Sequence, residues 1–232
     1  MSSRRRVAAV AVAAVVLAGA AGCLRQPADT VTYVALGASD AVGVGATDRQ
    51  REGWVPVLHG RMPEGTQLLN LGVSGSTLEE ALEDQLPAAV DADPDITTVW
   101  LAVNDLRAGV PLDEYRRDLE TLLDQLREAT TGPVAVANIP DLTRVPGFSS
   151  GGVPPGAPVG VIREEIGRWN AAIEEVAAER RVYVVDLFAA SQELAQHPEY
   201  VSADGTHPST AGHRRLAEMF WDVIGDDVEA EI

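Results

Sequence analysis

Short apolar runs alternate with longer amphipathic stretches through most of the chain, and this alternation constrains the fold more than any other feature. Five runs have the length and near-continuous apolarity of strands covered on both faces: residues 31–36, 67–71, 96–103, 134–139 and 182–187. Stretches of helical length lie between and after them, at about 53–61, 77–90, 112–130, 161–180 and 209–224. Such alternation implies parallel strands joined by right-handed crossovers. We therefore expect an α/β fold, a three-layer α/β/α sandwich with a five-stranded parallel sheet.

Residues 77–90 show the helical pattern clearly. Acidic residues take one helical face and apolar residues recur on the other, as Leu78, Ala81, Leu82 and Leu86. We find no internal repeat and no second core, so residues 31–232 are interpreted as one domain. The longest stretch without periodicity is 141–160, which is rich in proline and glycine, and we expect it to overhang the functional site.

The charged residues exclude several functions. The 232 residues include 18 basic and 35 acidic side chains, and the net charge is −17. A surface this negative repels phosphate backbones, so we expect no nucleic-acid partner. All basic residues are Arg, which excludes a P-loop lysine and a Schiff-base lysine. Cys23 is the only cysteine, which excludes an intrachain disulfide and a multi-cysteine zinc site.

The N-terminus has the pattern of an export signal. Arg4, Arg5 and Arg6 precede an uncharged apolar run at residues 7–21. We interpret residues 1–22 as a signal peptide, because a permanent membrane span needs about 20 apolar residues. The small residues before Cys23 resemble the lipobox of bacterial lipoproteins, although Ala20 stands where that motif usually has Leu.

This resemblance implies lipidation of Cys23, with residues 23–30 as a lipidated tether. We therefore expect an extracytoplasmic protein that is held at a membrane surface by a lipid anchor. Ordinary secretion, with Cys23 an incidental residue near the cleavage site, is the alternative.

Polar and glycine-rich segments follow the predicted strands, where ligands bind in parallel α/β folds. Ser39 directly follows the first strand in a glycine-rich turn and is a candidate nucleophile once a base takes its proton. His207 is the candidate base, and Asp204, three residues earlier, can orient its ring. The remaining histidines are weaker candidates, and we expect a solvated or capping role for His213 in the last helix.

An acyl-transfer reaction also requires donors for the developing oxyanion. The backbone N–H groups of Ser39 and Gly75 and the side-chain amide of Asn104 follow three strand ends that can converge. We interpret these three groups as a candidate oxyanion hole.

Four segments resemble blocks I, II, III and V of the GDSL or SGNH hydrolases, in that family's order: 37–39, 70–75, 102–105 and 204–208. The resemblance implies a flavodoxin-like SGNH fold, with Ser39 as nucleophile, His207 as base, Asp204 as its orienting acid, and Ser39, Gly75 and Asn104 as oxyanion donors. This sequence departs from the family pattern at two positions: it has Ala38 where block I usually has Asp, and Ala102 where block III usually has Gly.

We therefore predict a serine esterase that hydrolyses small-molecule carboxylic esters, whether lipid, short-chain acyl or acetylated glycan, without a metal or cofactor. A non-catalytic or weakly catalytic protein that binds cell-surface glycans is the main alternative. A flavodoxin-type nucleotide binder is disfavoured, because the glycine-rich turn at Gly43 and Gly45 is no phosphate fingerprint. The absence of Gly-x-Ser-x-Gly disfavours the nucleophile-elbow fold of α/β-hydrolases. The sequence leaves the acyl group, the alcohol and the oligomeric state open.

Overall fold

The computed structural model describes residues 30–147 and 157–230. The signal peptide predicted at 1–22, Cys23 and the tether up to residue 29 lie outside the described residues, as does the middle of the predicted overhanging loop. None of the helices in the two described ranges combines the length and the apolarity needed to cross a membrane.

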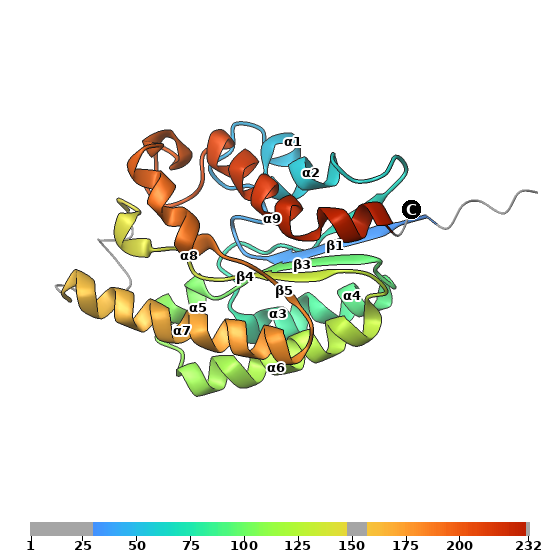
Figure 1. Cartoon of the computed structure of the whole chain (residues 1–232), viewed down its shortest axis with the longest axis horizontal. Coiled ribbons are helices and arrows are strands. Elements are labelled where there is room, and N and C mark those ends of the chain that lie inside the picture. Colours follow the sequence, from blue (N-terminus) through green and yellow to red (C-terminus); the bar gives the residue numbers. More distant parts are fainter. Residues whose placement is uncertain (1–29, 148–156, 231–232) are drawn as a thin grey trace, which may run out of the picture.

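Five parallel strands form the sheet in the described part of the chain (Figure 1). They are β1 (Thr32–Gly37), β2 (Gln67–Asn70), β3 (Ile96–Trp100), β4 (Val134–Ala137) and β5 (Tyr183–Val185). Their order is β2-β1-β3-β4-β5, and every neighbouring pair is parallel. The predicted fold class is confirmed.

Helices cover both faces of the sheet, and Figure 1 shows α2 and α9 on one side with α3, α6 and α7 on the other. The helices of the described residues are α1 (Arg49–Glu52), α2 (Trp54–His59), α3 (Leu78–Asp84), α4 (Leu86–Asp91), α5 (Val103–Ala108), α6 (Leu112–Ala129), α7 (Val159–Glu179), α8 (Leu187–Ala190) and α9 (Thr210–Ala230). Short 3-10 turns occur at η1 (Leu142–Arg144), η3 (Ser191–Ala195) and η4 (Pro198–Tyr200).

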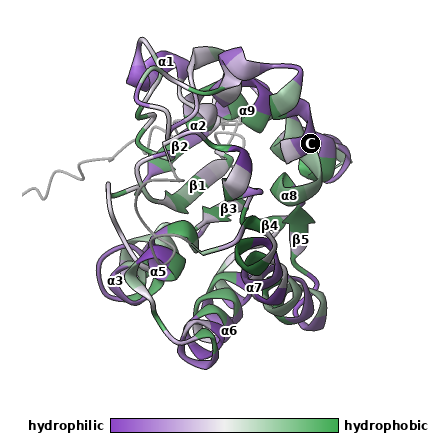
Figure 2. Cartoon of the chain, turned by 90° about the vertical axis from the view of Figure 1, so that its left-hand side faces the viewer, coloured by the Kyte–Doolittle hydropathy of each residue, from purple (hydrophilic) through white to green (hydrophobic). Residues whose placement is uncertain are grey.

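The side chains of β1 alternate between two hydrophobic cores. Val34 and Leu36 join the core under α3, α4, α6 and α7, whereas Tyr33 and Ala35 join the core under α2 and α9. In the second core the rings of Trp54 and Phe220 stack with centroids 4.4 Å apart. The flanking helices carry both hydrophobic and hydrophilic residues, as Figure 2 shows, because only one side of each packs on the sheet.

Two of the predicted elements, the helix at 77–90 and the strand at 96–103, differ from the observed ones for a clear physical reason. The single helix expected at 77–90 is divided into α3 and α4 at Gln85, because Pro87 has no N–H for the helical ladder. The strand expected at 96–103 ends at Trp100, and Val103 begins α5 instead. Leu101 and Ala102 are buried in the core although they are not part of the strand. Their apolar side chains therefore indicate burial and do not indicate a strand.

Candidate active site

Ser39 and His207 lie side by side at the edge of the sheet where the strands end. Ser39 follows β1 by two residues, and His207 precedes α9 by three. The Oγ of Ser39 lies 2.9 Å from Nε2 of His207, although 168 positions separate them in the sequence. An imidazole at this distance can take the proton of the hydroxyl. The structure thus brings the predicted nucleophile and the predicted base together.

The turn after β1 reaches the segment of His207 through Gly45. The N–H of Val44 donates to the carbonyl of Ser39 at 2.9 Å, which fixes the turn. Gly45 has a φ of +96°, and a Cβ at this position would collide with the backbone oxygen of Pro208 and come within 3.1 Å of the Cβ of His207. A glycine is therefore required where the first and last blocks touch.

Asp204 contacts the second ring nitrogen of His207. Its Oδ2 lies 2.7 Å from Nδ1, while Oδ1 accepts hydrogen bonds from the backbone N–H groups of Thr206 and His207 and from the hydroxyl of Ser202. Burial acts to raise the pKa of Asp204, but these hydrogen bonds outweigh it and hold the pKa well below its usual value. The carboxylate is therefore ionised at neutral pH and able to orient the imidazole.

Backbone bonds close the turn that carries both groups. Val201 and Pro208 form an antiparallel bridge, and the N–H of Ser202 donates to the carbonyl of His207 at 2.8 Å. Gly205, at the tip of the turn, has a φ of +75°. This closure folds the turn so that Asp204 lies beside His207, three residues later in the sequence.

Gly75 and Asn104 follow β2 and β3, the strands on either side of β1. The side-chain amide of Asn104 donates to the carbonyl of Ser76 at 2.9 Å, which joins the two segments. Gly75 is exposed and has a φ of +89°. Within the described ranges, the backbone N–H groups of Ser39 and Gly75 make no hydrogen bond. They are thus free to donate to an oxyanion.

Gln85 braces the serine turn, a role that the sequence analysis missed. It is buried, and its side-chain amide accepts from the N–H of Gly37 at 3.0 Å, donates to the carbonyl of Gly37 at 3.1 Å and donates to the hydroxyl of Ser76 at 3.2 Å. These bonds join the turn of Ser39 to the turn of Gly75. The available signal was a glutamine on the inward face of the predicted helix, seven residues after Leu78.

The two departures from the family pattern have structural consequences that do not remove a polar site group. Ala38 is buried in the core, and Gln85 supplies hydrogen bonds to the turn that Ala38 cannot make. The methyl group of Ala102 is also buried in this core, and the following Asn104 still reaches Ser76.

Two further carboxyl groups lie at the site. Burial raises the pKa of Asp40 to about 6, although the charge of His207 opposes the shift. Asp105 is buried, accepts from the N–H of Leu78 at 2.9 Å and has a pKa that burial raises to about 6. Asp105 follows Asn104 in the sequence, so this bond ties the start of α3, just after the Gly75 turn, to the segment that carries Asn104.

His213 does not have the solvated or capping role expected from the sequence. It is fully buried, accepts from the N–H of Trp54 at Nδ1 and bonds the carbonyl of Val44 through Nε2 at 3.0 Å. Burial lowers the pKa of His213. It connects α9 to α2 and to the turn after Ser39. No cluster of three or more potential metal ligands occurs within residues 30–147 and 157–230.

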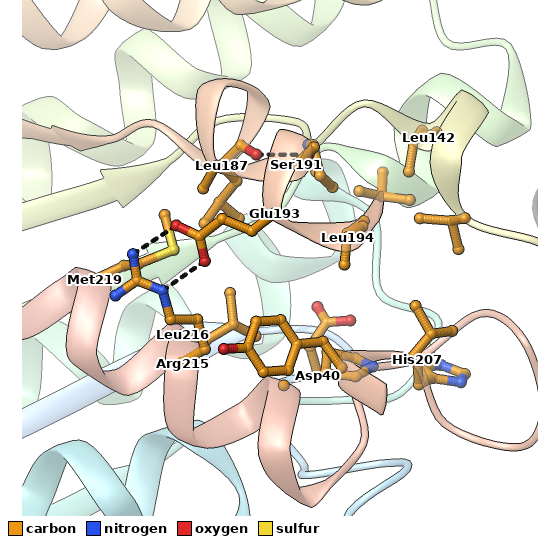
Figure 3. A pocket seen from close by; sticks show the side chains of 18 of the residues that line it. Asp40, Leu142, Leu187, Ser191, Glu193, Leu194, His207, Arg215, Leu216 and Met219 are labelled. Atoms are coloured by element: carbon orange, nitrogen blue, oxygen red, sulfur yellow. Dashed lines mark hydrogen bonds and ion pairs between the residues drawn. The ribbon is translucent and has the colours of Figure 1, made fainter. Parts of the chain in front are cut away.

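A large pocket opens beside His207. Its cavity volume is about 140 Å³, and much of its wall is apolar, with contributions from Leu142, Val145, Leu187, Leu194, Leu216 and Met219. Asp40 and His207 lie toward one side of it in Figure 3, and an ion pair between Glu193 and Arg215 lies on the other. A much smaller pocket contains Ser76 and Asn104 and shares Asp40, Trp100 and Val103 with the large one.

Comparison with known proteins establishes the family. The family model described as "GDSL-like Lipase/Acylhydrolase family" matches residues 35–215. The chain belongs to this family. It is a carboxylic ester hydrolase, and the resemblance of the four sequence blocks to the GDSL or SGNH hydrolases is confirmed.

Relatives in this family have low sequence identity but the same fold. An acetylxylan esterase of Geobacillus stearothermophilus is 24% identical over 184 residues, which cover 74% of this chain and 78% of the relative. The crystal structure of Axe2, an acetylxylan esterase from that organism, aligns with a TM-score of 0.67 at 22% identity, covering 84% of this chain and 94% of Axe2. The lipase/acylhydrolase from Enterococcus faecalis aligns with a TM-score of 0.62 at 21% identity, covering 82% and 93%.

Proposed function

We propose that this esterase forms an acyl-enzyme on Ser39, with His207 as general base and Asp204 as the group that orients it. The observation that carries the proposal is a continuous pair of short contacts, 2.9 Å from Ser39 Oγ to His207 Nε2 and 2.7 Å from His207 Nδ1 to Asp204 Oδ2. Serine hydrolases of unrelated folds use this arrangement. The charge of Asp204 favours nucleophilic attack, because the ionised carboxylate stabilises the imidazolium that forms when His207 takes the proton of Ser39.

In the first half-reaction, Ser39 Oγ attacks the ester carbonyl carbon while its proton passes to His207 Nε2. The carbonyl oxygen becomes an oxyanion, for which we propose the N–H groups of Ser39 and Gly75 and the amide of Asn104 as donors. The tetrahedral intermediate then collapses. The bond to the alkoxy oxygen breaks, His207 returns the proton to that oxygen, and the alcohol leaves.

In the second half-reaction, water replaces the alcohol beside His207. The imidazole takes a proton from this water as it attacks the acyl carbon, and the same donors hold the second oxyanion. Collapse breaks the bond to Ser39 Oγ, which regains its proton from His207. The carboxylic acid is released and ionises in water. No step needs a metal ion, so we expect activity to be unchanged by a chelator.

We propose small-molecule carboxylic esters as substrates. The name of the acetylxylan esterase relative indicates acetylated glycans as one class, and the lipase/acylhydrolase name of the family indicates longer acyl esters as another. Both classes carry the same carbonyl group to Ser39.

A fluorophosphonate probe tests the role of Ser39. We expect the probe to label the wild-type protein and not Ser39→Ala, and hydrolysis of p-nitrophenyl acetate to be lost in the same variant. Ser76→Ala is a matched control, because it removes another serine hydroxyl near the site and should keep labelling. Labelling of Ser39→Ala at the wild-type rate would contradict the assignment.

We also propose that the protein is exported and anchored through a lipid on Cys23, on the strength of residues 4–23 alone. Expression in a bacterium that processes lipoproteins, followed by membrane fractionation, tests this. The wild-type chain should sediment with membranes and Cys23→Ala should be released. Equal release of both proteins would contradict the anchor and favour ordinary secretion.

A further inference from the structure

We infer that the large pocket beside His207 binds the acyl chain of the ester, and that the preferred acyl group is an uncharged chain longer than acetyl. The inference rests on the proposed function and names the substrate class of the same site. It is carried by the position, the lining and the size of the pocket.

The position of the pocket connects it to the reacting atoms. The ring of His207 borders the large pocket, and Asn104 borders the small one. Asp40, Trp100 and Val103 border both. When the carbonyl group of an ester is held between Ser39 and Asn104, its acyl chain can therefore extend past Trp100 and Val103 into the large pocket.

The lining of the pocket selects for hydrocarbon. Its walls are dominated by aliphatic side chains from four places in the fold: Leu142 and Val145 after β4, Leu187 from α8, Leu194 from η3, and Leu216 and Met219 from α9. A polar sugar would lose its hydrogen bonds to water among such side chains, whereas a hydrocarbon chain gains free energy there.

The charged residues of the lining disfavour a charged chain. Asp40 stands where the two pockets meet, and within the described residues its carboxyl group makes no hydrogen bond or ion pair with another side chain. Glu193 and Arg215 already bind each other through two contacts of 2.8 and 2.9 Å. An acyl chain that ends in a carboxylate would meet Asp40 without finding a free cation among these residues.

The size of the pocket exceeds what acetyl needs. The pocket has a cavity volume of about 140 Å³. On the same measure a cavity needs about 10–15 Å³ to hold one water molecule, which is similar in size to a methyl group. The methyl group of an acetyl ester would therefore leave most of the pocket unfilled. Each further methylene buried in such a pocket strengthens binding by about fourfold until the space is used.

The acyl chain, and not the alcohol, is the occupant that suits the reaction. The acyl group stays attached to Ser39 through both half-reactions, so a fixed pocket can hold it throughout. The alcohol has to leave and be replaced by water beside His207, which a long chain held in the same pocket would obstruct.

The first experiment is a chain-length series of p-nitrophenyl esters from acetate to octanoate, below their micellar concentrations. We expect kcat/KM to rise at least about tenfold from acetate to the best longer ester. A wild-type protein that prefers acetate by tenfold or more over butyrate, hexanoate and octanoate would overturn the inference. Loss of activity in Ser39→Ala would still support the proposed function in that case. A failure of the acyl-chain inference can therefore be told apart from a failure of the proposed function.

The second experiment uses a matched pair of variants. Ala190 lines the pocket on α8, whereas Ala88 is exposed on α4. We expect Ala190→Phe to lower kcat/KM for octanoate at least tenfold while acetate stays within about twofold, and Ala88→Phe to change neither. Retained acetate hydrolysis shows that the variant is folded. An unchanged chain-length profile in folded Ala190→Phe would overturn the inference.

Met219→Ala tests the same pocket in the opposite direction and serves if Ala190→Phe does not fold. Removing the methionine side chain enlarges the pocket, so the optimum should move to a longer acyl chain. A parallel series of alkyl acetates, in which only the alcohol grows, should respond equally in wild type and variants. A pocket variant that alters the alcohol series and leaves the acyl series unchanged would overturn the acyl assignment.

Discussion

The side-chain amide of Gln85 hydrogen-bonds both the N–H and the carbonyl of Gly37, at 3.0 and 3.1 Å, two residues before Ser39. A third bond reaches the hydroxyl of Ser76, next to Gly75. One buried residue at the break between α3 and α4 thus holds together the two turns that carry the proposed nucleophile and one proposed oxyanion donor.

Replacing Gln85 by Leu should reduce both stability and turnover. The substitution leaves the N–H of Gly37 without a partner, whereas the carbonyl of Gly37 still accepts from the N–H of Val73 at 3.1 Å. We expect the free energy of unfolding to fall by about 1–3 kcal/mol. Turnover of a p-nitrophenyl ester should fall about tenfold as the turn of Ser39 loosens. Urea unfolding and steady-state kinetics measure the two effects.

Leu126→Ala is the control for Gln85→Leu. Leu126 is buried on α6, and its truncation should cost about 2–5 kcal/mol without changing kcat at temperatures where the variant is folded. Equal kcat in Gln85→Leu and Leu126→Ala at matched folded fractions would show that Gln85 acts on stability alone.

Gly45→Ala should impair catalysis through contact with the segment of His207. The added methyl group meets the backbone oxygen of Pro208, so the His207 turn has to move. We expect kcat to fall at least about tenfold, since small displacements of a catalytic base are costly. Gly65→Ala is a matched control, because Gly65 has a similar φ of +92° but has open space where its Cβ would be. Similar kcat values in the two variants would contradict the contact mechanism.

The proposed roles predict a graded loss of activity. Ser39→Ala and His207→Ala should each lower kcat by about 10⁴ or more, because the nucleophile and its base act as one unit. Asn104→Ala should lower kcat by about 10² to 10³, the usual effect of one oxyanion donor. Steady-state kinetics on one ester, with circular dichroism to verify folding, measures both. An Asn104→Ala loss below about threefold would remove Asn104 from the oxyanion hole.

The raised pKa of Asp40 predicts a stability difference that depends on pH. Burial raises this pKa from 3.8 to about 6, so the folded state holds the proton more tightly than the unfolded chain. The contribution of Asp40 to the free energy of unfolding therefore falls as pH rises from about 4 to 6, and the deficit persists above 6. Because Asp40 is partly exposed, we expect Asp40→Asn to be more stable than wild type by about 1–2 kcal/mol at pH 7.5.

At pH 3.5 the same two proteins should be nearly equal in stability, because Asp40 is protonated in the folded state and mostly protonated in the unfolded chain. Urea unfolding at the two pH values measures the difference. Asp91→Asn, on the exposed end of α4, is the control for the loss of an exposed carboxylate. A stability gain of the same size at both pH values would mean that Asp40 ionisation is not its cause.

Local sequence determined much of the fold and the list of candidate site residues. Apolar runs such as 134–139 become strands because a segment covered on both faces has to be apolar. Ser39, Gly75 and Asn104 were identifiable because each follows a strand, and parallel strands end at one edge. Local pattern was less reliable at boundaries. Leu101 and Ala102 are buried beyond the end of β3. Hydrophobicity alone does not distinguish a buried residue in a strand from a buried residue outside one.

Only the tertiary structure decided which side chains touch. The contact between Ser39 and His207 spans 168 positions, and it depends on α9 packing against α2 and on a glycine at 45 that permits close approach. The inward aim of Gln85, the burial of His213 and the pocket beside His207 likewise depend on contacts between segments distant in the sequence. A sequence pattern indicates which residues favour burial or a turn. Which distant side chains contact each other depends on how the crossover connections and the helices pack together.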